Sequence, residues 1–304
     1  MIRFPLLLAL AFLTFAAPIL KADGVVELKK GDRIVFIGGT LAAREQYFGH
    51  VEAMLHATFP KLELTVRNQG FTADEVRFRP RSLNFGEPDK HLTLARADVI
   101  LAFFGFAESF DGPEGLATFE KELRDFIAHT KSQNYSGKGA PRLVLFSPIA
   151  HEDLRSPNLP DGSKTNPNLE LYTKAMAGIC EKTATPFVDL YHPTLQMYRR
   201  EPRERGQGPY TFNGIHLTGA GYSRLAPVIV ESLTGETAPE KAVSRSLMRE
   251  IEEKNFQYFH RYRAVNGFYI YGGRSERPNG NPPFTDKYVL ENERAKLDEM
   301  CAVV

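Results

Sequence analysis

The sequence has no excess of charge of either sign. Lysine and arginine together number 38 against 37 for aspartate and glutamate, so the formal net charge is only +1. Proteins that bind nucleic acid through its phosphates need a positive field, and this balance therefore argues against a nucleic-acid partner. The 304 residues are 42% hydrophobic and 25% charged, an ordinary globular composition that excludes disordered and collagen-like chains.

Cysteine is also scarce. The two cysteines, Cys180 and Cys301, lie far apart, and neither belongs to a CxxC, CxxCH or Cys/His cluster. We therefore expect no metal and no cofactor, and we assign no haem because its attachment motif is missing. A disulfide between the two is compatible with the sequence but is not indicated by it.

Only one long apolar run is present, Phe4–Leu20, and a positively charged residue precedes it. Together with the small residue Ala22, this run is typical of a signal peptide. We expect residues 1–22 to be removed near Ala22, which leaves an extracytoplasmic chain, periplasmic or secreted, with no stable membrane span. The alternative is an uncleaved anchor, which Pro5 and Pro18 disfavour.

From residue 31 onward, short apolar runs alternate with longer amphipathic stretches, without internal repeats. This alternation predicts a parallel sheet covered by helices. The expected strands are Arg33–Ile37, Leu62–Val66, Ala97–Phe104, Arg142–Phe146 and Pro186–Leu190. Helices are expected over Leu41–Thr58, Gly115–Thr130, Asn168–Lys182 and Gly219–Leu233. The predicted fold class is α/β, a three-layer α/β/α sandwich with a five-stranded parallel, flavodoxin-like doubly wound sheet.

The composition changes after about residue 235, which divides a domain of residues 31–235 from a C-terminal helical extension of residues 236–304. Helices are expected over Ser244–Phe259 and from about Asp286 to Met300. The extension is rich in tyrosine, phenylalanine and arginine. These side chains either stack sugar rings beside the crevice or pack the extension against the main domain, and we favour packing.

Ligands of doubly wound sheets bind beyond the carboxyl ends of the strands, so the residues that follow each strand carry the most information. Four segments stand out there: Gly38–Leu41, Arg67–Gly70, Gly105–Ser109 and Asn213–Leu217. Their order and spacing resemble the four blocks of the SGNH (GDSL-type) hydrolase family, which read GDS-L, a glycine, G-x-N-D and D-x-x-H. The resemblance covers roughly residues 31–235.

The resemblance implies serine-esterase chemistry. The hydroxyl after the first strand attacks an acyl carbon, and the histidine of the last block takes its proton. In this chain these roles fall on Thr40 and His216, with Asn213 orienting the imidazole. The resemblance also implies an oxyanion site formed by the N–H groups of Thr40 and Gly70 and by the third-block position, which is Ala107.

Four positions depart from the family pattern. Gly39 replaces aspartate, and Thr40 replaces serine, which keeps the hydroxyl but adds a methyl group beside the line of attack. Ala107 replaces the oxyanion asparagine, and loss of one such donor typically costs about 2.7–4 kcal/mol of transition-state stabilisation. Asn213 replaces aspartate, although an amide oxygen can still accept the Nδ1–H of His216.

Other polar residues near the strand ends are candidates for substrate contact: Gly39, Asn68, Glu108, Ser109 and His151. His151 and Glu152 form either a substitute acid–base pair or a solvated loop cap. Ser109 and Ser147 are alternative nucleophiles.

Arg79 belongs to the run Arg77–Arg81, in which three arginines alternate. Because Pro80 favours an extended backbone, the three side chains can line one side and hold an anionic substrate group. We consider pairing with Asp74, Glu75 or Glu87 the better interpretation.

The sequence therefore predicts an SGNH-type hydrolase, acting on an ester such as an O-acylated carbohydrate through a Thr–His site with a depleted oxyanion hole. The alternative is a weak or inactive module with the same fold that binds carbohydrate or a protein partner. The oligomeric state is left open.

Overall fold

The computed structural model describes residues 24–81, 85–199, 208–237, 243–263 and 289–303. Its centre is a five-stranded sheet with the order β2-β1-β3-β4-β5. The strands are β1 (Arg33–Gly38), β2 (Thr65–Asn68), β3 (Val99–Phe103), β4 (Arg142–Phe146) and β5 (Phe187–Val188). All four pairings are parallel, so the predicted flavodoxin-like sheet is confirmed. The predicted signal peptide lies outside the described residues.

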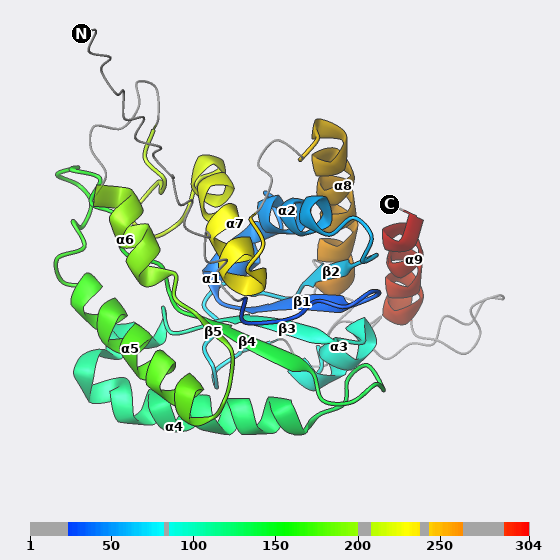
Figure 1. Ribbon diagram of the computed structural model, residues 1–304, viewed down its shortest axis with the longest axis horizontal. Helices are drawn as coiled ribbons and strands as arrows, with labels where there is room; N and C mark the ends of the chain where they lie inside the picture. The colour runs from blue at the N-terminus through cyan, green and yellow to red at the C-terminus, as the bar shows by residue number, and fades with distance from the viewer. Residues whose placement is uncertain (1–23, 82–84, 200–207, 238–242, 264–288, 304) are drawn as a thin grey trace, which may run out of the picture.

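Helices cover both faces of this sheet (Figure 1). One face carries α1 (Thr40–Glu45), α2 (His50–Thr58) and α7 (Gly219–Thr234). The other carries α3 (Pro88–Ala95), α4 (Gly112–Ser132) and α5 (Asn166–Lys182). Successive residues of β1 enter different cores: Ile34 packs on the α2/α7 side and Val35 on the α4/α5 side. This is the period of two expected of a strand, and the three-layer sandwich is thereby confirmed.

The central strand β3 is buried along its whole length. Strands covered on both faces are apolar without alternation, which explains why the continuous run Ala97–Phe104 predicted this strand well. Aromatic side chains join β3 to its neighbours at the carboxyl end. Phe103 stacks on Phe146 with ring centroids 4.4 Å apart, and this contact packs β3 against β4 at the carboxyl end of the sheet.

The predicted helix Leu41–Thr58 is two helices, α1 and α2. Gly49 breaks it with φ +62°, and a Cβ there would lie 2.6 Å from Ile251 Cγ2. The Glu45 carboxylate accepts a hydrogen bond of 2.6 Å from the Val51 N–H, which satisfies a free donor at the start of α2. The apolar periodicity continues through the break, which is why it predicted a single helix.

Two further helices, α3 and α6 (Tyr191–Arg199), and the 3₁₀ turn η1 (Glu108–Asp111) were not predicted. Both helices are short. Helix α6 begins directly after β5 and lies beside α5 at one edge of the molecule (Figure 1).

The C-terminal helices α8 (Arg245–Tyr262) and α9 (Val289–Val303) lie together beside β2, at the opposite edge of the sheet (Figure 1). The Gln69 amide nitrogen donates to the Tyr258 hydroxyl at 2.9 Å, so this part of the extension packs against the main domain. Cys180 and Cys301 are both buried and unpaired, and they belong to different apolar clusters.

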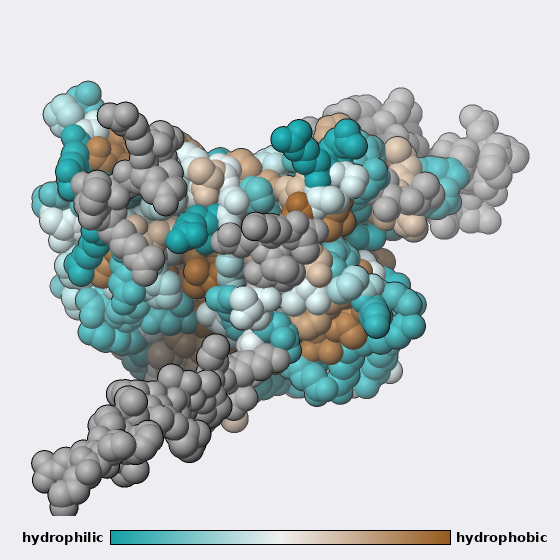
Figure 2. Space-filling model, turned by 45° about the horizontal axis from the view of Figure 1, so that its top comes forward, coloured by the Kyte–Doolittle hydropathy of each residue, from teal (hydrophilic) through white to brown (hydrophobic). Residues whose placement is uncertain are grey.

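On the face shown in Figure 2, hydrophilic residues cover most of the described surface, and apolar residues emerge in separate areas. Within the described ranges, no helix is both long enough and apolar enough to cross a membrane.

Candidate active site

The turn after β1 carries Thr40 to the carboxyl edge of the sheet. Gly38 has φ +117°, and a Cβ there would lie 2.1 Å from the Phe103 carbonyl oxygen, so only glycine fits. The Gly39 N–H then donates to the same carbonyl at 3.0 Å. Thr40 is the first residue of α1 and lies at its N-terminus, where backbone N–H groups have no intrahelical acceptor.

The second half of the site is the segment Thr211–Leu217, which we call the histidine loop. An antiparallel bridge joins Thr211 to Leu217 and closes the loop at its base. Glu152, which is fully buried, accepts hydrogen bonds of 2.7 Å from both the N–H and the hydroxyl of Thr211. The Glu152 N–H donates to the Gly214 carbonyl at 2.8 Å. One buried carboxylate therefore fixes the loop that presents His216.

Within this loop, the Asn213 side chain faces the His216 ring. The Asn213 Oδ1 atom accepts the His216 N–H at 3.0 Å and the Ile215 N–H at 3.3 Å. These two donors fix the amide orientation, because the opposite orientation would point an NH₂ group at two N–H groups. His216 Nδ1 then lies 2.9 Å from Asn213 Nδ2 and 3.1 Å from Oδ1.

This orientation has a consequence for the His216 tautomer. Because Nδ2 is a donor and lies nearest to Nδ1, this contact is a hydrogen bond only when the neutral ring accepts at Nδ1 and carries its proton on Nε2. An aspartate at position 213 would instead accept an Nδ1–H and leave Nε2 free to take a proton. Asn213 therefore holds the ring in place but favours the tautomer that is less useful for a general base.

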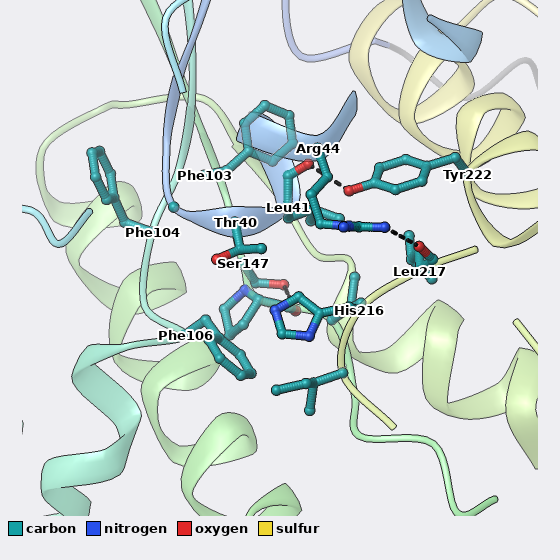
Figure 3. A pocket seen from close by; sticks show the side chains of 14 residues that line it. Thr40, Leu41, Arg44, Phe103, Phe104, Phe106, Ser147, His216, Leu217 and Tyr222 are labelled. Atoms are coloured by element: carbon teal, nitrogen blue, oxygen red, sulfur yellow. Dashed lines mark hydrogen bonds between the residues drawn. The ribbon is translucent and has the colours of Figure 1, made fainter. Parts of the chain in front are cut away.

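Thr40 and His216 line one small cavity of about 40 Å³. In Figure 3 their side chains point toward the same space, Thr40 from α1 and His216 from the histidine loop. Within the described chain, the His216 ring makes its hydrogen bonds through Nδ1 and none with Thr40. The remaining walls are mostly apolar and come from several strand ends: Leu41, Phe103, Phe104, Phe106, Pro148, Ile149, Ile215 and Leu217.

Arg44 is the cation of this cavity and was not predicted from the sequence. It follows Thr40 by four residues, one helical turn, and this spacing was the available signal. Its Nη2 donates to the Leu217 carbonyl at 3.5 Å, and its guanidinium lies 5.0 Å from the Phe212 ring centroid. Its buried Nε has no hydrogen-bond partner within the described chain. Burial lowers the pKa of His216, and the charge of Arg44 lowers it further.

The three oxyanion positions implied by the family resemblance differ in whether they have a free hydrogen-bond donor. The Gly70 N–H donates to Asn68 Oδ1 at 2.9 Å, and Asn68 Nδ2 donates to the Ala42 carbonyl at 2.7 Å. Asn68 therefore braces the turn against α1, and the Gly70 N–H is already engaged. Ala107 offers only a methyl group. The Thr40 N–H at the start of α1 is the donor that remains for an oxyanion.

Glu108, Ser109 and His151, which we expected to contact substrate, are not among the residues that line the cavity. The Glu108 carboxylate accepts the Val76 N–H at 2.8 Å and the Gly105 N–H at 2.9 Å, and the Ser109 hydroxyl donates to the Phe106 carbonyl at 2.7 Å. Burial raises the pKa of Glu108 to about 7. These contacts brace the turn after β3.

His151 is buried with both ring nitrogens engaged. Its Nε2 lies 3.2 Å from the Pro160 carbonyl oxygen, and its Nδ1 lies 2.8 Å from the Thr165 hydroxyl. His151 and Glu152 therefore act as supports for neighbouring loops, so neither interpretation from the sequence, an acid–base pair or a solvated cap, describes them.

Arg79 is also not among the residues that line the cavity. Its Nε and Nη2 donate to the Val76 carbonyl at 3.2 and 2.7 Å, and its guanidinium lies 5.3 Å from the Phe104 ring centroid. The neighbouring arginines are paired: Arg81 with Asp74 through two bonds of 2.7 Å, and Arg77 with Glu122 at 3.9 Å. The three arginines do not line one side as an anion site. The expected carboxylate pairing holds for Arg81 with Asp74.

Ser147, the other alternative nucleophile, lines the cavity, but its hydroxyl is saturated with backbone partners. Its Oγ donates to the Pro148 carbonyl at 2.9 Å and accepts the N–H groups of Leu190 and Tyr191 at 2.8 and 3.1 Å.

Among the described residues, no group of three or more histidine, cysteine, aspartate or glutamate side chains is arranged to hold a metal ion.

The chain matches no protein-family model and no curated protein. Solved structures with a similar fold include a catalytic mutant of an acetylxylan esterase from Geobacillus stearothermophilus, with a TM-score of 0.54 and 17% identity. That match covers 70% of this chain and 99% of the esterase. A gut microbial diltiazem-metabolizing enzyme has a TM-score of 0.54 at 16% identity, covering 69% of this chain and 48% of that one. At these identities the likeness establishes a shared fold.

The catalytic mutants of the Geobacillus esterase each replace one residue by alanine: a serine, an aspartate or a histidine. The aspartate and the histidine are three positions apart in that enzyme. Asn213 and His216 have the same separation in this chain.

Proposed function

We propose that this protein is an SGNH-type ester hydrolase whose site is Thr40 and His216, acting on an acylated carbohydrate. The observation that carries the proposal is the convergence of the two side chains on one cavity at the carboxyl edge of the sheet. The acetylxylan esterases of similar fold support the reaction class and suggest an acetylated sugar as substrate. Export through the N-terminal signal peptide is part of the proposal, since polysaccharide substrates are extracellular.

The proposed reaction uses the two side chains that line the cavity. The Thr40 Oγ1 attacks the acyl carbon, its proton passes to His216 Nε2, and the alcohol leaves with that proton. Water then hydrolyses the acyl-threonine by the same route and restores both groups. The Thr40 N–H at the N-terminus of α1 stabilises the negative oxygen of each tetrahedral intermediate.

The Asn213 amide limits this chemistry. Nε2 must be unprotonated to accept the Thr40 proton, yet the Asn213 Nδ2 contact favours the opposite tautomer. The Gly70 N–H must also leave Asn68 before it can stabilise an oxyanion. These contacts favour slow turnover, and they are the observations that support a second candidate, a binding module with this fold that has lost its chemistry.

Hydrolysis of p-nitrophenyl acetate and of acetylated xylooligosaccharides tests the proposal. Thr40→Ala and His216→Ala should each remove the activity, because one lacks the nucleophile and the other the base. Thr93→Ala and His129→Ala are matched controls at exposed positions and should retain it.

Equal hydrolysis by Thr40→Ala and the unaltered protein would exclude Thr40 as the nucleophile. If the unaltered protein shows no hydrolysis above the Thr40→Ala background but binds acetylated xylooligosaccharide, the binding module is the correct assignment.

A further inference from the structure

A second cavity lies at the β2 edge of the sheet, bounded by β2, α2, α3, α8 and α9. Figure 1 shows α8 and α9 beside this edge, next to β2, which is one of the two edge strands of the sheet. The cavity measures about 840 Å³, within the range of about 300–1,000 Å³ that is typical of small-molecule sites. It shares no described lining residue with the Thr40–His216 cavity.

Two of the charged groups in its wall are already neutralised. Lys254 is buried, and its Nζ donates to Glu52 at 2.7 Å, to the Val66 carbonyl at 3.1 Å and to Asn255 Oδ1 at 2.6 Å. These three bonds use all the donors of an ammonium group.

Arg261 is neutralised in the same way, because its Nε donates to Asp298 at 2.8 Å and so joins α8 to α9. Both ion pairs belong to the cavity lining, and in each of them a carboxylate offsets the charge of the cation.

Arg33 and Arg67, which belong to strands of the sheet, differ from Lys254 and Arg261 because neither forms an ion pair within the described chain. Arg33 in β1 pairs in register with Thr65, and Arg67 is two residues further along β2, so these side chains project from the same face of the sheet. Within the described chain, neither guanidinium lies within 4.0 Å of a carboxylate. Arg67 Nη1 donates only to the Val66 carbonyl, at 2.9 Å, and its guanidinium lies 5.4 Å from the Tyr258 ring centroid.

The charge balance of the cavity favours an anion. Its lining contains four arginine and lysine side chains against three carboxylates, and the one carboxylate outside the two ion pairs, Glu250, is exposed to solvent. The lining also contains His56, whose Nε2 lies 3.7 Å from a Glu52 carboxylate oxygen. Burial lowers the pKa of Lys254, and the positive charge of Arg67 lowers it further while Glu52 opposes both. The charge of Arg67 therefore reaches the Lys254 side of the cavity.

We infer that this cavity binds a small organic anion whose carboxylate or phosphate group accepts hydrogen bonds from Arg33 and Arg67. A guanidinium offers paired N–H donors that match either group. The body of the ligand packs along Tyr258 and the apolar side chains of Leu64, Leu94 and Ile251 in the same wall. The inference does not depend on the proposed esterase site.

Isothermal titration calorimetry of the full chain with glucuronate, glucose 6-phosphate and glucose tests it. Glucuronate reports on a carboxylate, glucose 6-phosphate on a phosphate, and glucose supplies the same ring without charge. At least one of the two anions should bind, glucose should not, and added salt should weaken the binding. Inorganic phosphate is the remaining arm, and it should bind more weakly than the organic anion that binds.

Arg33→Gln and Arg67→Gln should each raise the Kd of the bound anion by about tenfold or more, because each removes a charge-assisted hydrogen bond. Arg124→Gln is the matched control, since it removes the same charge from the exposed face of α4. Thr40→Ala should also bind normally, which separates this site from the esterase site. Circular dichroism establishes that each variant is folded.

Three results would overturn the inference: binding of neither anion at millimolar concentration, equal affinity for inorganic phosphate and the organic anion, or Kd values unchanged in both arginine variants. If Arg67→Gln fails to fold, Arg33→Gln alone decides, because Arg33 makes no side-chain contact that the described fold requires.

Discussion

At the scale of single residues, Asn213 has the largest effect on the chemistry of the candidate site. Its Oδ1 is held by two backbone N–H groups, so its NH₂ group is the nearer neighbour of His216 Nδ1. A carboxylate in the same place would accept a proton from Nδ1 without any change of shape. One side-chain atom therefore decides which tautomer of His216 the Asn213 contact favours.

Asn213→Asp should accordingly raise kcat/KM for p-nitrophenyl acetate. The reverse exchange in the serine-protease triad costs about 10⁴ in kcat through the wrong tautomer, so a gain of about tenfold or more is expected here. The same variant should raise the pKa of His216, because a carboxylate stabilises imidazolium, and move the acidic limb of the pH–rate profile upward. Asn158→Asp, in an exposed loop, controls for the added charge. An unchanged rate would show that the tautomer does not limit the reaction.

At the scale of elements, the histidine loop depends on one glycine. Gly214 has φ +92°, and a Cβ there would lie 2.3 Å from His151 Nε2, an atom fixed in turn by its contact with the Pro160 carbonyl oxygen. The loop therefore packs against a buried imidazole that cannot move away easily. The close approach to His151 and the Glu152 hydrogen bonds therefore both position the loop that carries His216.

Gly214→Ala should destabilise the protein and reduce the hydrolysis rate. Backbone strain at positive φ costs about 1–3 kcal/mol, and the clash with His151 adds to it. Gly137→Ala is a close control: its φ is +80°, but a Cβ there meets nothing within 4 Å, so it reports the strain alone. Thermal unfolding should show a lower Tm for Gly214→Ala than for Gly137→Ala. Equal Tm values would mean that the loop can move away from His151.

The elements were largely predictable where a strand is a buried apolar run, as in β1, β3 and β4. Strand β2 (Thr65–Asn68) contains Arg67 and Asn68 and begins three residues later than the predicted Leu62–Val66, because its polar second half breaks the apolar pattern. The parallel sheet and the segments after its strand ends were accessible in that way, whereas the choice of Thr40 and His216 within those segments came from the resemblance to the SGNH family. The break at Gly49 was not, because it depends on a contact with Ile251 in a distant helix. The support from Glu152 was hidden for the same reason: its partner Thr211 is 59 residues away.

At the scale of the whole molecule, two buried carboxyl groups should set the dependence of stability on pH. Burial raises the pKa of Glu45 from 4.5 to about 8 and that of Glu108 to about 7. In the folded state both therefore keep their protons over a range in which the unfolded chain has lost them. At these two groups the folded protein binds more protons there, so their contribution to stability falls as the pH rises from about 5 toward 8. His91 acts in the opposite direction below about pH 6.5, because burial lowers its pKa to about 4.

Glu45→Gln should remove most of the Glu45 share of this loss, because the amide oxygen can still accept the Val51 N–H but the group no longer ionises. Between pH 5.5 and 8.5, the free energy of unfolding of the unaltered protein should fall by about 3 kcal/mol more than that of Glu45→Gln. Urea unfolding at the two pH values measures this, with the exposed Glu63→Gln as the control. Parallel losses in all three proteins would show that Glu45 titrates normally.

The most direct test of the central claim is covalent labelling with a fluorophosphonate, followed by peptide mass spectrometry. A nucleophile paired with His216 should carry the label on Thr40, faster in Asn213→Asp than in the unaltered protein and not at all in His216→Ala. A label on Ser147, on any other residue, or on none in both the unaltered protein and Asn213→Asp would contradict the account.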